Sequence, residues 1–220
     1  MIKQGGMDMS LAVSRYVKQF YRGNIFAATE NGRNGRDVHN LISADIKAVR
    51  RAVQGLGDYD YDEGEGGELM NKVQAFVNTY NNYIGSAKEM DDSNVTRYAS
   101  QLKKLTKENA EELADIGITV QSSGKLKVDK EVLQDATRYE VSKVFSADAE
   151  YSTEVEKKMK QTDRMVIRNN LNIPKPAVQK KTKSNNNSAT GISMQASDEN
   201  AQLVRQLTEV LAGSQIDYTL

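Results

Sequence analysis

The chain has 220 residues, and its 30 Lys and Arg residues balance its 30 Asp and Glu residues, so the formal net charge is zero. That balance lacks the basic surplus of a typical nucleic-acid-binding protein, so we expect no nucleic acid among its partners. The chain contains no Cys and one His. This composition excludes disulfides, Cys nucleophiles, iron–sulfur clusters and multi-His metal sites, while the length suits one compact domain or two small ones.

The N-terminal region, residues 1–55, is predicted to form two helices joined by a loop. The first helix spans residues 8–21, where apolar side chains recur at near-helical spacing. Residues 23–36 contain Asn-Gly steps, which favour turns with positive φ, so a loop or a short hairpin is expected there. The second helix spans residues 37–54, with Asp37 as its N-cap, and carries one apolar stripe: Val38, Leu41, Ile42, Ile46, Val49 and Val53.

Residues 56–67 are rich in Gly and acidic side chains and are predicted to be a solvated linker. Three aspartates alternate here like the first ligands of an EF-hand calcium loop: Asp58, Asp60 and Asp62. That loop requires Gly at its sixth position and Glu at its twelfth, where this chain has Glu63 and Leu69. We therefore predict no metal site, and these aspartates are only a weak candidate ligand set.

Residues 68–170 are predicted to form a helical body that contains one β-hairpin. Its first helix, over residues 68–89, keeps an apolar face for four turns: Leu69, Val73, Phe76, Val77, Tyr80 and Ile84. An acidic break at residues 91–93 caps a second helix, which continues to residue 114.

Residues 117–128 change from the helical period to an alternation of apolar and polar side chains. A three-residue connection ends in Gly124, which suits a type I turn followed by a bulge. In that register the apolar pairs are Ile118 with Val128 and Val120 with Leu126. One face of the hairpin is then apolar and the other polar, and a shift by one residue would destroy this separation.

Two helices are predicted after the hairpin, one over residues 130–145 with Asp129 as its N-cap and one over residues 152–169. Together these elements predict a mainly α fold. We expect an antiparallel helical bundle with one small β-hairpin at about residues 117–128.

The C-terminal part carries the candidate interaction site. Residues 171–197 contain both Pro residues, several Lys residues and a run of Asn, so a disordered polar linker is predicted. Residues 198–213 are predicted to form an amphipathic helix with an apolar stripe made of Leu203, Leu207, Val210 and Leu211. A short helix cannot bury such a stripe alone, so we expect the stripe to dock on the first helix of its own chain or on a neighbouring chain.

No set of residues indicates catalysis or cofactor binding. His39 lacks an orienting carboxylate and a nucleophile, because the adjacent Asp37 points elsewhere on a helix. The Gly pairs near residues 55 and 64 lack the Lys-Ser/Thr of a phosphate-binding loop. We therefore expect no catalytic residues, no cofactor and no enzyme activity. No apolar run approaches the roughly 20 residues that span a bilayer, so we expect no membrane insertion.

Three segments within residues 68–145 stand in series. They read Phe-Val-Asn-Thr-Tyr-Asn at 76–81, Leu-Ala-Asp-Ile-Gly-Ile-Thr at 113–119 and Ser-Gly-Lys-Leu-Lys-Val-Asp at 123–129, followed by Leu133, Ala136 and Phe145. In residues, order and spacing, this series resembles the C-terminal helical and hairpin module of bacterial flagellar capping proteins, the hook-associated protein 2 family.

The resemblance implies a non-catalytic structural or assembly protein that forms a homo-oligomer or binds flagellin-type subunits. It also implies signal-less export to the bacterial flagellum and the extracellular space. Capping proteins carry β-rich domains between their terminal helices, which this sequence does not encode, so it corresponds to a shortened relative. The alternative is a cytoplasmic helical interaction or adaptor protein, or an export chaperone, without cap activity.

Overall fold

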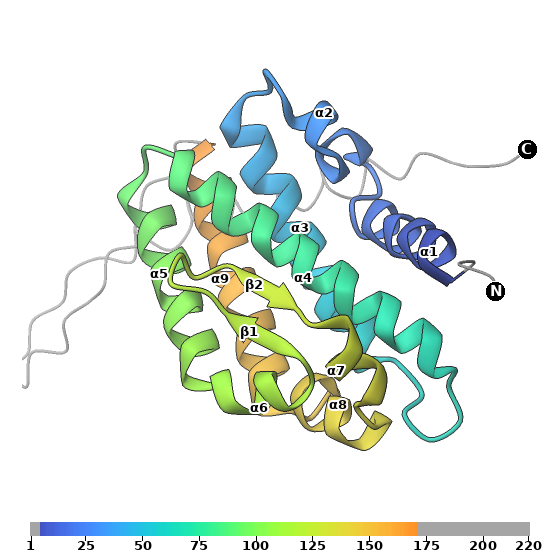
Figure 1. Ribbon diagram of the computed structural model, residues 1–220. Helices are drawn as coiled ribbons and strands as arrows, with labels where there is room; N and C mark the ends of the chain where they lie inside the picture. Colours follow the sequence, from blue (N-terminus) through green and yellow to red (C-terminus); the bar gives the residue numbers. More distant parts are fainter. Residues whose placement is uncertain (1–4, 171–220) are drawn as a thin grey trace, which may run out of the picture. The chain divides into compact units, whose positions relative to one another are not determined.

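The computed structural model describes residues 5–170 (Figure 1). Over these residues the fold is mainly α with one small antiparallel β-hairpin, which confirms the predicted fold class. They all belong to one compact unit. The predicted linker over 171–197 and the predicted helix over 198–213 lie outside the described residues. Within the described part, no helix is both long and apolar enough to cross a membrane.

In chain order the elements are α1 (Gly5–Phe20), η1 (Ile25–Ala28), α2 (Glu30–Arg33), α3 (Val38–Gly57), α4 (Gly66–Glu89), α5 (Ser93–Glu108), α6 (Ala110–Asp115), β1 (Ile118–Val120), β2 (Leu126–Val128), α7 (Lys130–Asp135), α8 (Arg138–Phe145) and α9 (Glu150–Asn170). The long helices α3, α4 and α9 lie close to their predicted ranges. The expected loop over residues 23–36 instead contains η1 and the one-turn helix α2. Helix α2 forms there because the Thr29 hydroxyl accepts the N–H of Gly32 at 3.2 Å and caps the turn.

Two predicted helices are each broken in two. The helix expected to reach residue 114 stops at Asn109, whose side chain donates to the carbonyl of Leu105 at 2.8 Å. The helix expected over 130–145 stops at Ala136, and Thr137 with Glu140 then forms a capping box that starts α8. In both places a short polar side chain bonds the backbone and competes with continuation of the helix.

The hairpin has the predicted register, with Ile118 opposite Val128 and Val120 opposite Leu126. Its turn ends at Gly124 with a φ of 80°, the left-handed conformation that Gly adopts without strain. Strand β2 contacts α4, and β1 contacts α6, so the hairpin lies across one side of the helices (Figure 1).

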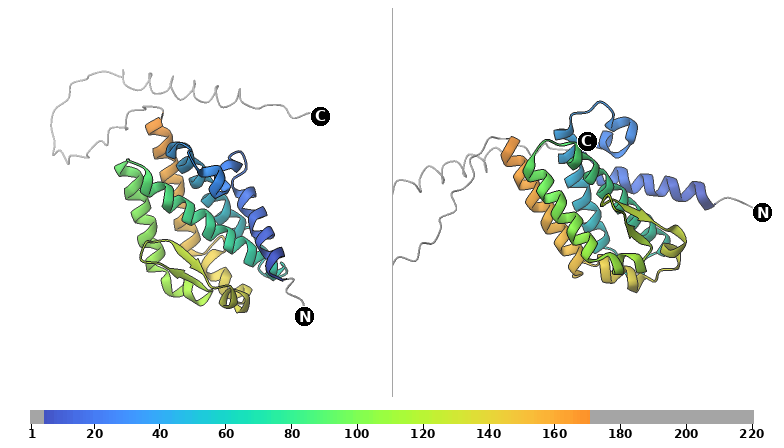
Figure 2. Two further views of the ribbon diagram at one scale, coloured as in Figure 1. Left: turned by 45° about the horizontal axis from the view of Figure 1, so that its top comes forward. Right: turned by 60° about the vertical axis from the view of Figure 1, so that its left-hand side comes forward.

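The helices pack around α3 and α4, which make the most extensive contact in the fold. Helix α9 lies against both α3 and α5, and α1 lies against α4 (Figure 2). The centre contains an aromatic cluster. The centroid of the Phe145 ring lies 5.0 Å from that of Phe76 and 6.0 Å from that of Tyr151, and both contacts are edge to face. These aromatic contacts join α4, α8 and α9 into one core.

The acidic segment over residues 56–67 is held by two tyrosines. The rings of Tyr59 and Tyr61 contact each other edge to face, with their centroids 5.2 Å apart, and Tyr59 is 7% exposed. Their hydroxyls donate to the carbonyls of Glu65 and Leu56, at 2.8 and 2.9 Å. The segment is therefore anchored to the body by its aromatic residues, while the side chains of its acidic residues up to Glu65 are exposed.

Candidate functional site

The residues that the sequence singled out as sites fall in two places. Leu203, Leu207, Val210 and Leu211 lie outside the described residues. The acidic set of Asp58, Asp60 and Asp62 lies in the segment that the tyrosines anchor, and all three aspartates are exposed.

Asp60 has a local backbone role in this segment. Its Oδ1 accepts the N–H groups of Asp62 and Glu63, both at 3.0 Å, and these bonds lower the pKa of the Asp60 carboxyl. Over residues 5–170, no group of three or more His, Cys, Asp or Glu side chains is placed to hold a metal ion. Asp60 therefore acts as a turn residue on a solvated surface.

A buried polar network, which we call the Asp45 cluster, lies where four segments meet. It consists of Tyr21 after α1, Arg33 at the end of α2, Asp45 on α3, and Asn82 and Ser86 one turn apart on α4. Arg33 donates to both carboxylate oxygens of Asp45 at 2.8 Å, and the hydroxyls of Tyr21 and Ser86 donate to them at 2.5 and 2.6 Å. Asn82 donates to the Tyr21 hydroxyl at 3.1 Å, so the network spans every element of this corner.

The electrostatics of the Asp45 cluster keep the Arg33 guanidinium charged and the Tyr21 hydroxyl protonated. Asp45 is fully buried, so its charge requires the bidentate pair with Arg33. Burial works against the charge on Arg33, but its hydrogen bonds and attraction to Asp45 outweigh that effect and raise its pKa. Burial and the neighbouring Asp45 also raise the pKa of Tyr21, so this hydroxyl stays protonated and continues to donate.

The hydrogen bonds of the Asp45 cluster hold neighbouring elements together. The Ser86 hydroxyl donates to the Asp45 carboxylate, whose charge is paired with Arg33, and so joins α4 to that ion pair. Arg33 also donates to the carbonyl of Ala27 at 2.9 Å, which ties η1 to the same point. The cluster therefore fixes the segment between α1 and α3 onto α3 and α4.

An open pocket of about 540 Å³ lies above the Asp45 cluster, between α2, α4 and the hairpin. Apart from the paired Arg33, its charged lining consists of two cations, Arg36 and Lys125, and two acids, Glu30 and Glu89. Because the two signs are mixed, the charge of the lining does not indicate a ligand of either sign.

The junction between α4 and the hairpin depends on one side chain. The Asn81 amide donates to the carbonyl of Leu126 and accepts the N–H of the same residue, both at 2.8 Å. It thereby pairs the outer edge of β2 as a neighbouring strand would. Asn81 ends the first of the three segments that stand in series in the sequence (76–81, 113–119 and 123–129), and Leu126 lies in the third.

The other end of the hairpin is closed by Gly117 and Asp129. Gly117 has a φ of 76°, and a Cβ built on it would lie 2.7 Å from the carbonyl oxygen of Asp129. The N–H of Asp129 donates to the carbonyl of Gly117 at 2.7 Å. The side chain of Asp129 meanwhile caps α7, as predicted, by accepting the N–H groups of Glu131 and Val132.

The Asp45 cluster was not predicted from the sequence, although one signal of it was present. Asp45 stands one turn from Leu41 and Ile42, on the apolar face of the predicted helix over 37–54. An acid on a buried face requires a buried cation or donors. The pattern does not say which of the 30 Lys and Arg residues supplies that cation, because Arg33 lies in a segment expected to be a loop.

Comparisons with protein families, with curated proteins and with solved structures found no match for this chain.

Proposed function

We propose that this protein is a non-catalytic structural or assembly protein, similar to the flagellar filament cap, that self-associates or binds flagellin-type subunits. On this proposal it is exported without a cleaved signal and acts at the flagellum. The observation that carries the proposal is that the three resembling segments contact one another as one packing unit.

Each resembling segment supplies a side chain or backbone group that another one needs. Asn81 of the first segment bonds Leu126 of the third, and Gly117 of the second bonds Asp129 of the third. Phe76 of the first packs on Phe145 at the end of the series. Three segments could each resemble a family by chance if they did not contact one another in the fold. Here the segments bond and pack against one another. This mutual dependence supports a common module.

The polar groups of the module also support a structural role. The hydroxyls of Tyr80 and Tyr151 both lie 3.2 Å from the hydroxyl of Thr106. The Thr106 hydroxyl itself donates to the carbonyl of Leu102 at 2.9 Å. This buried chain links α4, α5 and α9. Like the Asp45 cluster, it uses its hydroxyls to hold helices together.

The test is the solution mass of the full chain by light scattering over a range of concentrations, alone and mixed with flagellin monomers. We expect an oligomer or a complex with flagellin. Leu207→Asp places a charge in the predicted apolar stripe and is expected to abolish that association. Thr208→Asp adds the same charge beside the stripe and is the matched control, expected to associate as the unaltered chain does.

A chain that stays monomeric at every concentration and binds no flagellin would contradict the proposal. It would favour the alternative, a helical adaptor or export chaperone that acts on another protein.

A further inference from the structure

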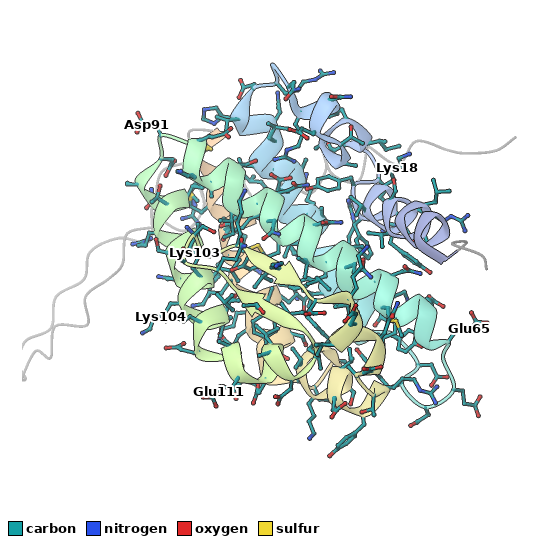
Figure 3. The ribbon with its side chains drawn as sticks, in the orientation of Figure 1. Lys18, Glu65, Asp91, Lys103, Lys104 and Glu111 are labelled. Carbon is teal, nitrogen blue, oxygen red and sulfur yellow. The ribbon has the colours of Figure 1, made fainter. Side chains whose placement is uncertain are left out.

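A groove of about 510 Å³ lies between α5 and the tip of the hairpin. One wall is formed by Lys103, Lys104 and Lys107 on α5, and the other by residues 120–124, from the end of β1 through the turn. Figure 3 shows Lys103 and Lys104 on α5 beside the hairpin. The Asp45 cluster does not use this surface, and of the three-segment module only Ser123 and Gly124 border it.

The β1 side of the groove has unpaired backbone groups. The N–H of Gln121 bonds Lys125 and the N–H of Asp129 bonds Gly117, so the opposed residues at these two positions are hydrogen-bonded pairs. Bonded and non-bonded pairs alternate along an antiparallel ladder, which makes Val120 and Leu126 a non-bonded pair. Their N–H and C=O groups therefore point away from the hairpin.

The two outer edges differ in one respect. On β2, Asn81 satisfies both outward groups of Leu126. On β1, no residue in the described part of the chain bonds the N–H or C=O of Val120 across the outer edge. An edge left open in this way is a template for another extended segment.

The charge of the α5 wall is positive. Among the described residues, neither Lys103 nor Lys107 has an ion-pair partner, while Lys104 lies 3.6 Å from Glu108. Lys103 is also held in position, since its aliphatic stem crosses Gly124, where an added Cβ would lie 2.6 Å from its Cδ. The absence of a side chain at Gly124 thus lets Lys103 lie against the hairpin tip.

The spacing of these groups suits one kind of ligand. Lys103 and Lys107 are about 6 Å apart along the helix axis, at about 1.5 Å per residue. Alternate side chains of an extended chain are about 6.6 Å apart. An extended segment with acidic residues at alternate positions can therefore place successive carboxylates opposite these lysines.

We propose that this groove binds an extended acidic segment of a partner protein, which hydrogen-bonds the outer edge of β1 at Val120 and pairs its carboxylates with Lys103, Lys104 and Lys107. The inference is independent of the cap-like function. It requires only the open edge and the three lysines of α5.

The probe is a fluorescein-labelled peptide of alternating Glu and Val, titrated with the full chain by fluorescence anisotropy. We expect saturable binding that weakens with added salt. The double variant Lys104→Gln/Lys107→Gln should weaken it by about twofold to thirtyfold, since each exposed pair contributes about 0.2–1 kcal/mol. The matched control is Lys157→Gln/Lys160→Gln on α9, which should bind as the unaltered chain does.

The contribution of the strand edge is tested separately. Val120→Pro removes the outward N–H but no bond between β1 and β2, and should weaken binding about fivefold, the equivalent of one hydrogen bond. Val120→Ala keeps that N–H and is its control. If Val120→Pro alters the fold, amide hydrogen exchange on the unaltered chain replaces it, and exchange at Val120 should slow when the peptide is bound.

Four results would overturn the proposal. They are no binding of the Glu-Val peptide, equal binding of a Lys-Val peptide, equal competition by single-stranded DNA, and unchanged exchange at Val120 in the bound state. DNA competition would indicate a general polyanion surface instead of a site for an extended acidic chain.

Discussion

At the scale of single residues, Asp45 is the most consequential polar group in the described structure. It is fully buried and accepts hydrogen bonds from Arg33, Tyr21 and Ser86, each from a different part of the chain. A buried ion pair adds little net stability compared with a well-packed apolar pair, but losing one partner is costly. Asp45 therefore contributes mainly by specifying how the N-terminal segment is placed.

Asp45→Asn is expected to lower the free energy of unfolding by about 3–5 kcal/mol, because it leaves the charge of Arg33 half-buried without its counterion. Urea denaturation measures the loss. Asp91→Asn, at an exposed position, is the control and should change stability by less than about 0.5 kcal/mol. Equal stability of the two variants would mean that water or another group satisfies Arg33.

At the scale of elements, the attachment of the hairpin to α4 depends on Asn81. The hairpin has two strands of three residues and could not persist in isolation. Asn81 supplies a donor and an acceptor where a third strand would supply them.

Asn81→Ala is expected to reduce stability by about 1–3 kcal/mol, because the N–H and C=O of Leu126 lose their partners. Amide hydrogen exchange at Leu126 should accelerate more than exchange within α3. The control is Asn78→Ala, which alters an exposed residue of the same helix. Unchanged exchange at Leu126 would show that the apolar face alone holds the hairpin.

Two glycines are expected to respond oppositely to Ala. Gly117→Ala should destabilise by more than about 1 kcal/mol, because its positive φ and the nearby Asp129 carbonyl leave no room for a Cβ. Gly85→Ala, inside α4 and one turn before its last residue Glu89, with nothing within 4 Å of the added Cβ, should stabilise by up to about 1 kcal/mol. Thermal melts of both variants test the pair, and a shift of the same sign in both would contradict this explanation.

At the scale of the whole molecule, buried tyrosines couple stability to alkaline pH. Burial raises the pKa of Tyr80 to about 12, and also raises the pKa values of Tyr21, Tyr83 and Tyr151. In the unfolded chain these groups ionise near pH 10. Above that pH the unfolded state binds fewer protons than the folded state, so the free energy of unfolding falls as pH rises.

Stability should therefore be independent of tyrosine ionisation below about pH 10 and should fall through about pH 12 and beyond. Urea denaturation at several alkaline pH values measures this slope. Tyr80→Phe removes one titrating group and should flatten the fall by up to about 1.4 kcal/mol per pH unit. An unchanged slope would show that Tyr80 ionises as readily in the folded protein as in the unfolded one.

The elements whose signal is local and periodic can be predicted from the sequence alone. The apolar stripes of α3 and α4 and the two-residue alternation of the hairpin were enough to place those elements and the strand register, because a shift would expose apolar side chains to water. Local capping chemistry also placed Asp37 and Asp129 correctly at their helix starts. The interruptions of the helices at Asn109 and Ala136 were not predicted, because the apolar stripe continues through both positions. The polar side chains that end these helices bond only backbone groups within a few residues of themselves.

Contacts between groups that are distant in the sequence follow from the tertiary packing. Three such features depend on how the helices pack and not on any repeat in the sequence. They are the pair of Arg33 and Asp45, the bonds between Asn81 and Leu126, and the open edge of β1 beside the lysines of α5. Periodicity reports which face of an element is buried, because burial follows hydrophobicity. It does not report which partner lies opposite, because many arrangements bury the same apolar area and the choice among them rests on a few polar contacts.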